Sequence, residues 1–333
     1  MKSIHRVFFK NSNSMKEISS KSVDLVVTSP PYPLVELWDE LFSTMNPEIK
    51  EALKTHNGLL AFELMHQELD KVWKEVYRVL KIGGIACINV GDAVRTIGKD
   101  FRLYSNHSRI LNFYLKLGFN VLPEIIWRKP TNAPNKFMGS GMLPPNAYIT
   151  LEHEFILILR KEGKRGFKKD TEKLNRQESA YFWEERNTWF SDLWNLPGIS
   201  QELLNNEARK RSAAFTFELA YRLVNMFSVK DDIVLDPFLG TGTTTLAAIC
   251  SERNSVGYEL DPSFKSIINK RIGNSVEFAN TLIKERLQKH ETFVKKRIAN
   301  DKPLKYMNKV HHFPVKTQQE INIAINSIKY IEE

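Results

Sequence analysis

The sequence predicts an α/β protein built on a doubly wound, mainly parallel β-sheet. Short apolar runs at residues 23–28 (VDLVVT), 85–90 (IACINV) and 232–236 (DIVLD) are typical of strands buried on both faces of such a sheet. Segments in which apolar residues recur at helical spacing lie between these runs. Strands that alternate with helices favour parallel βαβ units over an antiparallel sheet.

The first half of the chain gives these elements in order. After the strand at 23–28, apolar residues at helical spacing predict a helix over 69–80, and the Gly83-Gly84 pair supplies a stop. The run at 85–90 is then the next strand. A second helix over about 106–117 leads into a strand within VLPEIIWRK, residues 121–129.

The second half repeats the pattern with a strand, a helix and a strand at 232–236, 243–252 and 255–261. Between the halves, residues 131–208 carry many of the Pro, Asn and Trp residues and a strand, LEHEFILILRK, that looks isolated. We interpret this stretch as an insertion on the sheet or a small second domain. After about residue 274 the chain is predicted to be helical and lysine-rich to its end.

Composition favours an ordinary soluble globular protein. The chain has 333 residues, of which 42% are hydrophobic and 26% charged. We find no apolar run of about 18 residues, so no transmembrane helix is expected, and the N-terminal apolar stretch is too short for a signal peptide. The two cysteines, Cys87 and Cys250, argue against a disulfide scaffold and a cysteine-based metal site. A cytoplasmic location follows, with no metal and no membrane partner.

The charge balance favours a polyanionic partner. Forty-eight Lys and Arg residues against 39 Asp and Glu give a net charge of +9. Nucleic acid is the first candidate and an anionic membrane surface the second. Basic residues gather at 161–169 and 208–211 and again in the C-terminal part.

A glycine-containing turn follows the strand at 232–236. The stretch VLDPFLGTGTTTLAA places Asp236 at the strand end, Gly240 and Gly242 in the turn, and the start of a helix just after them. Residue 245 is Thr, so the dinucleotide-binding fingerprint lacks its third glycine. Glu259 ends the next strand, in the position that binds a ribose diol. The residues therefore predict a site for a nucleoside that carries an amine.

A second unusual stretch follows the first strand. Residues 26–32, VVTSPPY, place a hydroxyl, two prolines and an aromatic ring directly after a buried strand. With the glycine-rich turn, this stretch resembles the DNA amino-methyltransferases, whose catalytic motif has Ser, Asp or Asn before Pro-Pro-Tyr or Pro-Pro-Phe. The likeness extends to VLKIGG, EIIWRKPTNAP, AAFTFELAYRLV and VGYELD. The catalytic motif precedes the cofactor motif, an order that resembles the beta group.

The resemblance implies a Rossmann-like methyltransferase sheet, S-adenosylmethionine as cofactor and double-stranded DNA as partner. It divides the chain into a catalytic half (1–134), a target-recognition region (135–208), a cofactor-binding half (209–273) and a basic helical extension (274–333). The cofactor residues it implies are Asp236, Pro237, Phe238, Gly240, Gly242, Thr243, Thr244, Glu259 and Asp261. A homodimer and a cognate restriction endonuclease stay open as further partners.

The catalytic residues that the resemblance implies are Ser29, Pro30, Pro31 and Tyr32. The Ser29 hydroxyl and the Pro30 carbonyl would accept hydrogen bonds from an exocyclic amine whose nitrogen becomes positive, and Tyr32 would stack on a base that has left the duplex. Asn89 and Asp92 end the next strand and are candidates for catalytic support. His153 and Glu154 are interpreted as structural.

Phosphate contacts are expected from the basic run inside the recognition region, at Lys161, Lys164, Arg165, Lys168 and Lys169. No proline is followed by cysteine, which disfavours methylation of cytosine C5. Ser at the first motif position resembles the cytosine-N4 enzymes, and adenine-N6 methylation stays open. An RNA methyltransferase, a nucleotide-dependent oxidoreductase and a non-catalytic nucleic-acid-binding module are the alternatives.

Overall fold

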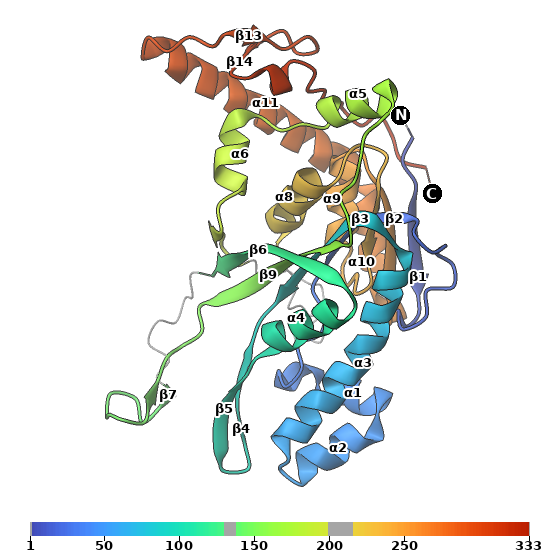
Figure 1. Ribbon diagram of the computed structural model, residues 1–333, viewed down its shortest axis with the longest axis vertical. Coiled ribbons are helices and arrows are strands. Elements are labelled where there is room, and N and C mark those ends of the chain that lie inside the picture. Colours follow the sequence, from blue (N-terminus) through green and yellow to red (C-terminus); the bar gives the residue numbers. More distant parts are fainter. Residues whose placement is uncertain (1, 130–137, 199–215, 333) are drawn as a thin grey trace.

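The centre of the molecule is an eight-stranded sheet (Figure 1). The computed structural model describes residues 2–129, 138–198 and 216–332. The strand order is β1-β12-β11-β2-β3-β9-β6-β10. These strands are β1 (His5–Phe9), β2 (Val23–Thr28), β3 (Leu80–Val90), β6 (Phe119–Arg128), β9 (His153–Lys161), β10 (Leu193–Asn195), β11 (Ile233–Asp236) and β12 (Asn254–Glu259).

In the described residues, three two-stranded ribbons lie outside this sheet, and helices surround it. The ribbons pair β4 (Ala93–Ile97) with β5 (Asp100–Tyr104), β7 (Met138–Gly139) with β8 (Ala147–Tyr148), and β13 (Tyr306–Met307) with β14 (Pro314–Val315). The α-helices in the described ranges are α1 (Asp39–Met45), α2 (Pro47–Lys54), α3 (Gly58–Val79), α4 (Asn106–Lys116), α5 (Asp170–Glu178), α6 (Trp183–Trp189), α8 (Phe217–Phe227), α9 (Thr243–Cys250), α10 (Lys265–Gly273) and α11 (Ser275–Ala299). Short 3₁₀ turns are η1 (Glu36–Trp38), η2 (Pro262–Phe264) and η3 (Gln318–Glu320).

The predicted parallel sheet is confirmed, with one exception in its direction. β1, β12, β11, β2 and β3 pair in parallel, as do β6 and β10. Strand β9 runs antiparallel to both of its neighbours, β3 and β6. Its amino end therefore lies at the edge of the sheet where the parallel strands have their carboxyl ends.

The prediction of an isolated strand at 151–161 was wrong. Ile156 to Leu159 are at most 2% exposed, so both faces of β9 are covered. Four consecutive apolar side chains cannot be buried by an insertion standing alone, because a strand presents them alternately to two opposite faces. A place inside the sheet buries both sets. The expected segment boundaries near 134 and 208 lie outside the described residues.

Helices cover the sheet on both faces. Val26 of β2 belongs to a core built with α3 and α4, whereas Leu25 and Val27 face a second core built with α8 and α9. This alternation follows from the two-residue period of a strand. It explains why the first predicted strand is apolar throughout: all six of its residues are buried.

The predicted end of the helix at 69–80 needs correction. Helix α3 ends at Val79, and Leu80 begins β3 at once, so Gly83 and Gly84 lie within the strand. Gly83 has φ +78°, and a Cβ there would lie 2.4 Å from the backbone nitrogen of Arg165. This glycine therefore permits the close approach of another chain segment.

The C-terminal part is helical only in its first half. Helices α10 and α11 are present, but residues 300–332 form loops with the β13–β14 ribbon and η3. The buried side chain of Asn308 holds these loops, since it accepts from the backbone of Val310 and His311 and donates to the carbonyls of Glu320 and Ile323. None of the described helices combines the length and apolar content needed to cross a bilayer.

Candidate active site

A cleft of about 380 Å³ opens at the edge where the parallel strands end. The ends of β2, β11 and β12 bring Ser29, Pro237 and Glu259 to its wall. Ligands of open α/β sheets bind at this edge because the loops after the strands diverge there. The expected residues that line the cleft are Ser29, Pro30, Pro31, Pro237, Phe238, Gly240, Thr243, Glu259 and Asp261.

The glycine-rich turn after β11 has the backbone that its sequence requires. Gly240 and Gly242 have φ of +55° and +84°, values that other residues adopt only with strain. Gly242 is the N-cap of α9, so the helix begins on Thr243 as predicted. The turn brings backbone to the cleft without side-chain bulk.

Asp236 is buried next to this turn, which it supports, and it does not line the cleft. It is 1% exposed, and its carboxylate accepts from Thr28 Oγ1 at 2.6 Å, Thr244 Oγ1 at 2.7 Å and the Phe238 backbone nitrogen at 3.0 Å. Burial raises the pKa of Asp236 to about 6. Thr244 is likewise buried in contact with it. The geometry gives Asp236 and Thr244 a role in shaping the loop.

Glu259 lies in the cleft. Its carboxylate accepts from the backbone nitrogens of Gly240 at 2.7 Å and Asp261 at 2.9 Å. Burial raises the pKa of Glu259 from its ordinary value. Asp261 also lines the cleft and caps η2 by accepting from Ser263 N. Both carboxylates therefore stand where hydroxyl or amine groups of a ligand can reach them.

The end of β2 has two parts with different surroundings. Ser29, Pro30 and Pro31 line the cleft, whereas Tyr32 is 6% exposed and lies behind them. The Tyr32 hydroxyl is 2.9 Å from Ser29 Oγ and donates to Glu154 Oε2 at 3.0 Å. Burial raises the pKa of Tyr32 well above its ordinary value. Its ring is not open to a stacking partner in this conformation.

Asn89 and Asp92 differ in what they contact. Asn89 is buried and its Nδ2 donates to Tyr32 Oη at 2.8 Å and to Glu154 Oε2 at 2.6 Å. Asp92 instead accepts from the backbone nitrogen of His107, and its carboxylate lies 2.8 Å from the Nδ1 atom of the His107 ring. Of the two predicted supporting residues, the structure brings Asn89 to Ser29 and assigns Asp92 to the start of α4.

Glu154 was interpreted as structural and belongs to this cluster. It reaches the site because β9 is antiparallel, so that its first residues lie at the carboxyl edge of the parallel strands. Lys129 Nζ pairs with its other carboxylate oxygen. The signal in the sequence is an acidic residue beside an apolar strand, where a charge needs a partner.

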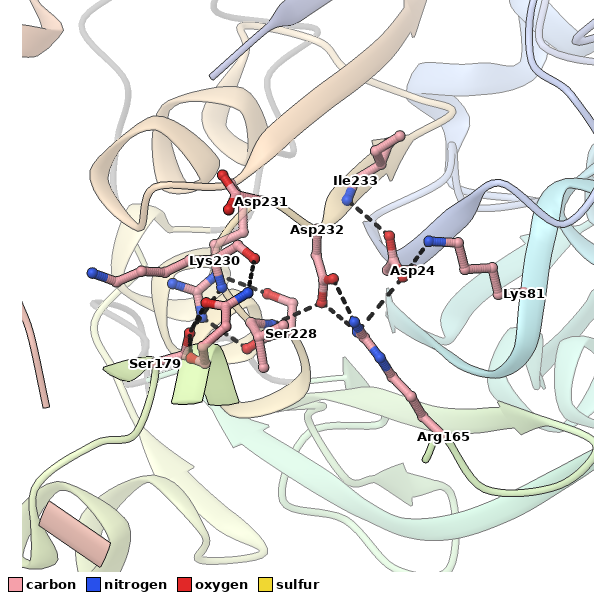
Figure 2. A network of polar contacts seen from close by, with 12 residues as sticks. Asp24, Lys81, Arg165, Ser179, Ser228, Lys230, Asp231, Asp232 and Ile233 are labelled. Carbon is pink, nitrogen blue, oxygen red and sulfur yellow. Dashed lines mark hydrogen bonds and ion pairs between the residues drawn. The ribbon is translucent and has the colours of Figure 1, made fainter. Parts of the chain in front are cut away.

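The basic run lies at the opposite edge of the sheet, where two of its residues, Lys161 and Arg165, bind groups of the protein itself. Lys161 is 1% exposed, and its Nζ donates to the carbonyls of Tyr77 at 2.6 Å and Leu80 at 3.0 Å. Figure 2 shows Arg165 between Asp232, 2.5 Å away, and Asp24, 3.5 Å away.

Asp24 and Asp232 lie at the amino ends of β2 and β11. Lys161 is therefore a buried support of the fold, and Arg165 supports it through its ion pairs from an exposed position. Lys164, Lys168 and Lys169 are also exposed and lie in the same loop, away from Ser29. The further basic stretch at 208–211 lies outside the described residues.

Part of the cleft wall could not be predicted. Leu37, Trp38 and Leu41, from η1 and α1, also line it, as do Lys10 and Ser12 after β1. These segments are short and carry no motif. Trp38 and Met45 pack against the main core, which fixes this wall to the body of the protein.

A doubly wound sheet whose glycine-rich turn and Ser-Pro-Pro strand end share one cleft defines a methyltransferase that uses a nucleoside cofactor. Residues 23–270 match the N6 and N4 DNA methylase family, and the chain belongs to this family. It is an S-adenosylmethionine-dependent DNA methyltransferase. The oxidoreductase, RNA-methyltransferase and binding-module alternatives are thereby set aside.

Two relatives and one solved structure cover most of the chain. The chain is 55% identical over 327 residues to the Type II methyltransferase M.MthZI of Methanothermobacter thermautotrophicus, covering 98% of this chain and 91% of the relative. It is 51% identical over 281 residues to the Type II methyltransferase M.MjaI of Methanocaldococcus jannaschii, covering 81% and 91%. A proposed DNA modification methylase of Thermus thermophilus, solved with S-adenosyl-L-methionine, has 31% identity and a TM-score of 0.64, covering 82% and 95%.

Proposed function

We propose that the chain methylates the exocyclic N4 amine of cytosine in double-stranded DNA. The observation that carries the proposal is the position of Ser29. This residue lines the cofactor cleft, and its hydroxyl contacts Tyr32 and Asn89, which lie behind it. Serine at this position resembles the cytosine-N4 enzymes. Adenine-N6 methylation is the alternative, because the same acceptors could serve either amine.

The chemistry requires the amine to present its nitrogen lone pair to the methyl group. That lone pair is delocalised into the base, so hydrogen-bond acceptors on the two amine hydrogens favour a pyramidal nitrogen and stabilise its developing charge. We assign these acceptors to Ser29 Oγ and the Pro30 carbonyl. S-adenosylmethionine supplies the methyl group when bound, held by Glu259 and the backbone of the turn at Gly240.

The target base must leave the duplex to reach this strand end. In the proposal the neighbouring side chains uncover the Tyr32 ring, at present 6% exposed, so that it stacks on the base while its hydroxyl keeps its contacts with Ser29 and Glu154. Tyr32→Ala should weaken capture of an extruded base by roughly 1–3 kcal/mol. A fluorescent base analogue at the target position reports that capture, and unchanged fluorescence on binding would remove Tyr32 from the base pocket.

The identity of the target base is tested by digesting plasmid DNA that the protein has methylated and separating the nucleosides before mass spectrometry. We expect N4-methylcytosine, which chromatography distinguishes from its C5 isomer. N6-methyladenine in its place would establish the alternative.

The role of Ser29 is tested by single-turnover methylation. Ser29→Ala should lower the rate by about 10²-fold or more, on the scale of losing one polar group at a charge-developing centre. Cofactor and DNA affinities should change little, and Ser29→Asp, which keeps an acceptor, should retain activity. A parent-like rate for Ser29→Ala would refute the assignment.

We propose that target recognition belongs to the stretch before β9 rather than to the basic run after it. Figure 1 shows the β4–β5 ribbon and β7 projecting from the same end of the sheet. The rings of Phe101 and Tyr148 stack between these ribbons at 4.4 Å, and Met142 at the tip is 82% exposed. Met142→Asp should weaken binding of plasmid DNA, whereas parent-like binding would exclude this tip.

Two further partners stay proposals. The names of M.MthZI and M.MjaI as Type II methyltransferases support a cognate restriction endonuclease, and resistance of methylated plasmid to such an enzyme would test it. A homodimer would be recognised by light scattering of the purified protein.

A further inference from the structure

A chain of hydrogen bonds leads from Ser29 away from the cleft and ends on Glu154. Ser29 Oγ lies 2.9 Å from Tyr32 Oη, which lies 3.0 Å from Glu154 Oε2. Asn89 Nδ2 donates to both Tyr32 Oη and Glu154 Oε2. Three separate strands, β2, β3 and β9, thus meet behind the proposed catalytic hydroxyl.

The carboxylate at its end fixes the direction of this chain. A carboxylate only accepts hydrogen bonds, so the single hydroxyl proton of Tyr32 must point to Glu154. The Tyr32 oxygen then accepts from Asn89 and from the Ser29 hydroxyl. With its own proton directed inward, Ser29 presents its lone pairs to the cleft. The chain therefore makes Ser29 an acceptor, which is what a target amine requires.

Close packing and charge support this arrangement. A Cβ on Gly91 would lie 3.0 Å from the Tyr32 ring and 3.2 Å from Glu154 Cγ, so glycine allows these side chains to meet. Lys129 Nζ pairs with Glu154 Oε1, so a cation lies beside this side chain. Other titratable or charged groups around this end of β9 are His153 on the strand itself, the Arg128–Glu152 pair beside it, and His107, which lies against Asp92 and is stacked on Phe155.

We propose that Glu154 is a positioning residue that orients Ser29 and receives the proton that the methylated amine must lose. The inference rests on the proposed role of Ser29. As the nitrogen–carbon bond forms and the sulfur–carbon bond breaks, the nitrogen becomes positive. Its proton passes to Ser29 Oγ, the Ser29 proton to Tyr32 Oη, and the Tyr32 proton to Glu154 Oε2. The positive charge brought by the sulfonium is balanced by neutralisation of the carboxylate, and the proton later leaves to water.

The test is the pH dependence of single-turnover methylation of plasmid DNA by the full chain. The parent rate should fall at low pH, because a protonated Glu154 can accept no further proton. Glu154→Gln still offers an oxygen to Tyr32 but cannot take a proton, so its rate should be at least tenfold lower and should lack that fall. Glu152→Gln is the matched control, since Glu152 is a partly exposed carboxylate two residues earlier that pairs with Arg128.

A second variant tests the inference if Glu154→Gln does not fold. Tyr32→Phe keeps the ring and cuts the chain in its middle, so it should lower the rate similarly, and the double variant should be no slower than either single variant. A parent-like rate and pH profile for Glu154→Gln, or independent effects of the two changes, would overturn the inference. If Ser29→Ala is impaired and Glu154→Gln is not, only this inference fails; if Ser29→Ala is parent-like, the proposed function fails.

Discussion

Replacing Asp236 by asparagine is expected to stabilise the folded protein above pH 6 and to change its stability little at pH 4. The carboxyl is buried, and its pKa in the fold is about 6 against an ordinary value of 3.8. The folded state therefore binds the proton more tightly than the unfolded state. Ionisation destabilises the fold progressively as the pH rises from 3.8 to 6, and fully above 6.

The size of the effect follows from the two pKa values. Their difference corresponds to roughly 3 kcal/mol, as an upper limit. An unfolding entropy of about 2.1 cal/mol/K per residue gives about 0.7 kcal/mol/K for a chain of this length, hence a rise in Tm of up to about 4 °C at pH 8. Asparagine fits the site, because its oxygen can accept from Thr28 and Phe238. Thr244 can accept from the new amide and donate to the Val27 carbonyl, 3.2 Å away.

Calorimetric scans of the cofactor-free protein from pH 4 to pH 8 test this expectation. Glu291→Gln, an equivalent change at an exposed position of α11, is the control and should show no pH-dependent gain. A variant with a lower Tm than the parent at pH 8 would refute the reasoning. It would mean that the hydrogen bonds of the carboxylate outweigh the cost of its burial.

Three more outcomes are expected. Glu259→Ala should weaken S-adenosylmethionine binding at least tenfold, about 1.4 kcal/mol, and equal calorimetric affinities would remove Glu259 from the site. Neutralising Lys164, Lys168 and Lys169 together should leave the salt dependence of DNA binding unchanged, because their loop lies at the far edge of the sheet. If the slope of log affinity against log salt concentration fell by about two to three, these lysines would instead contact DNA phosphates. Arg165→Met should lower the free energy of unfolding by about 2 kcal/mol in urea titrations, since it leaves the buried Asp232 without its ion pair, and an unaltered midpoint would contradict that.

The sequence allowed the central part of the site to be predicted because parallel strands end at one edge. Ser29 and Glu259 each follow an apolar run, so their proximity follows from the fold class. The direction of β9 could not be predicted, because the apolar pattern of a strand is the same in both directions. That single unknown decides the surroundings of two residues. It brings Glu154 to Tyr32, behind Ser29, and takes Lys161 to the opposite edge. The residues around Trp38 that line the cleft show no helical or strand periodicity, so the sequence did not indicate that they belong to the site.

Strand β9 also determines how the chain tolerates insertions and deletions. Glu154 is held near its first residue and Lys161 at its last, so polar groups fix the strand at both edges of the sheet. Deleting one residue between 155 and 160 would reverse the facing of every side chain beyond the deletion and separate one anchor from its partners. Changes of length in the turn at 140–146, between β7 and β8, leave both anchors in place. The outer loops can therefore change in length over evolution, while β9 keeps a constant distance between the edge of the sheet that carries Ser29 and the opposite edge.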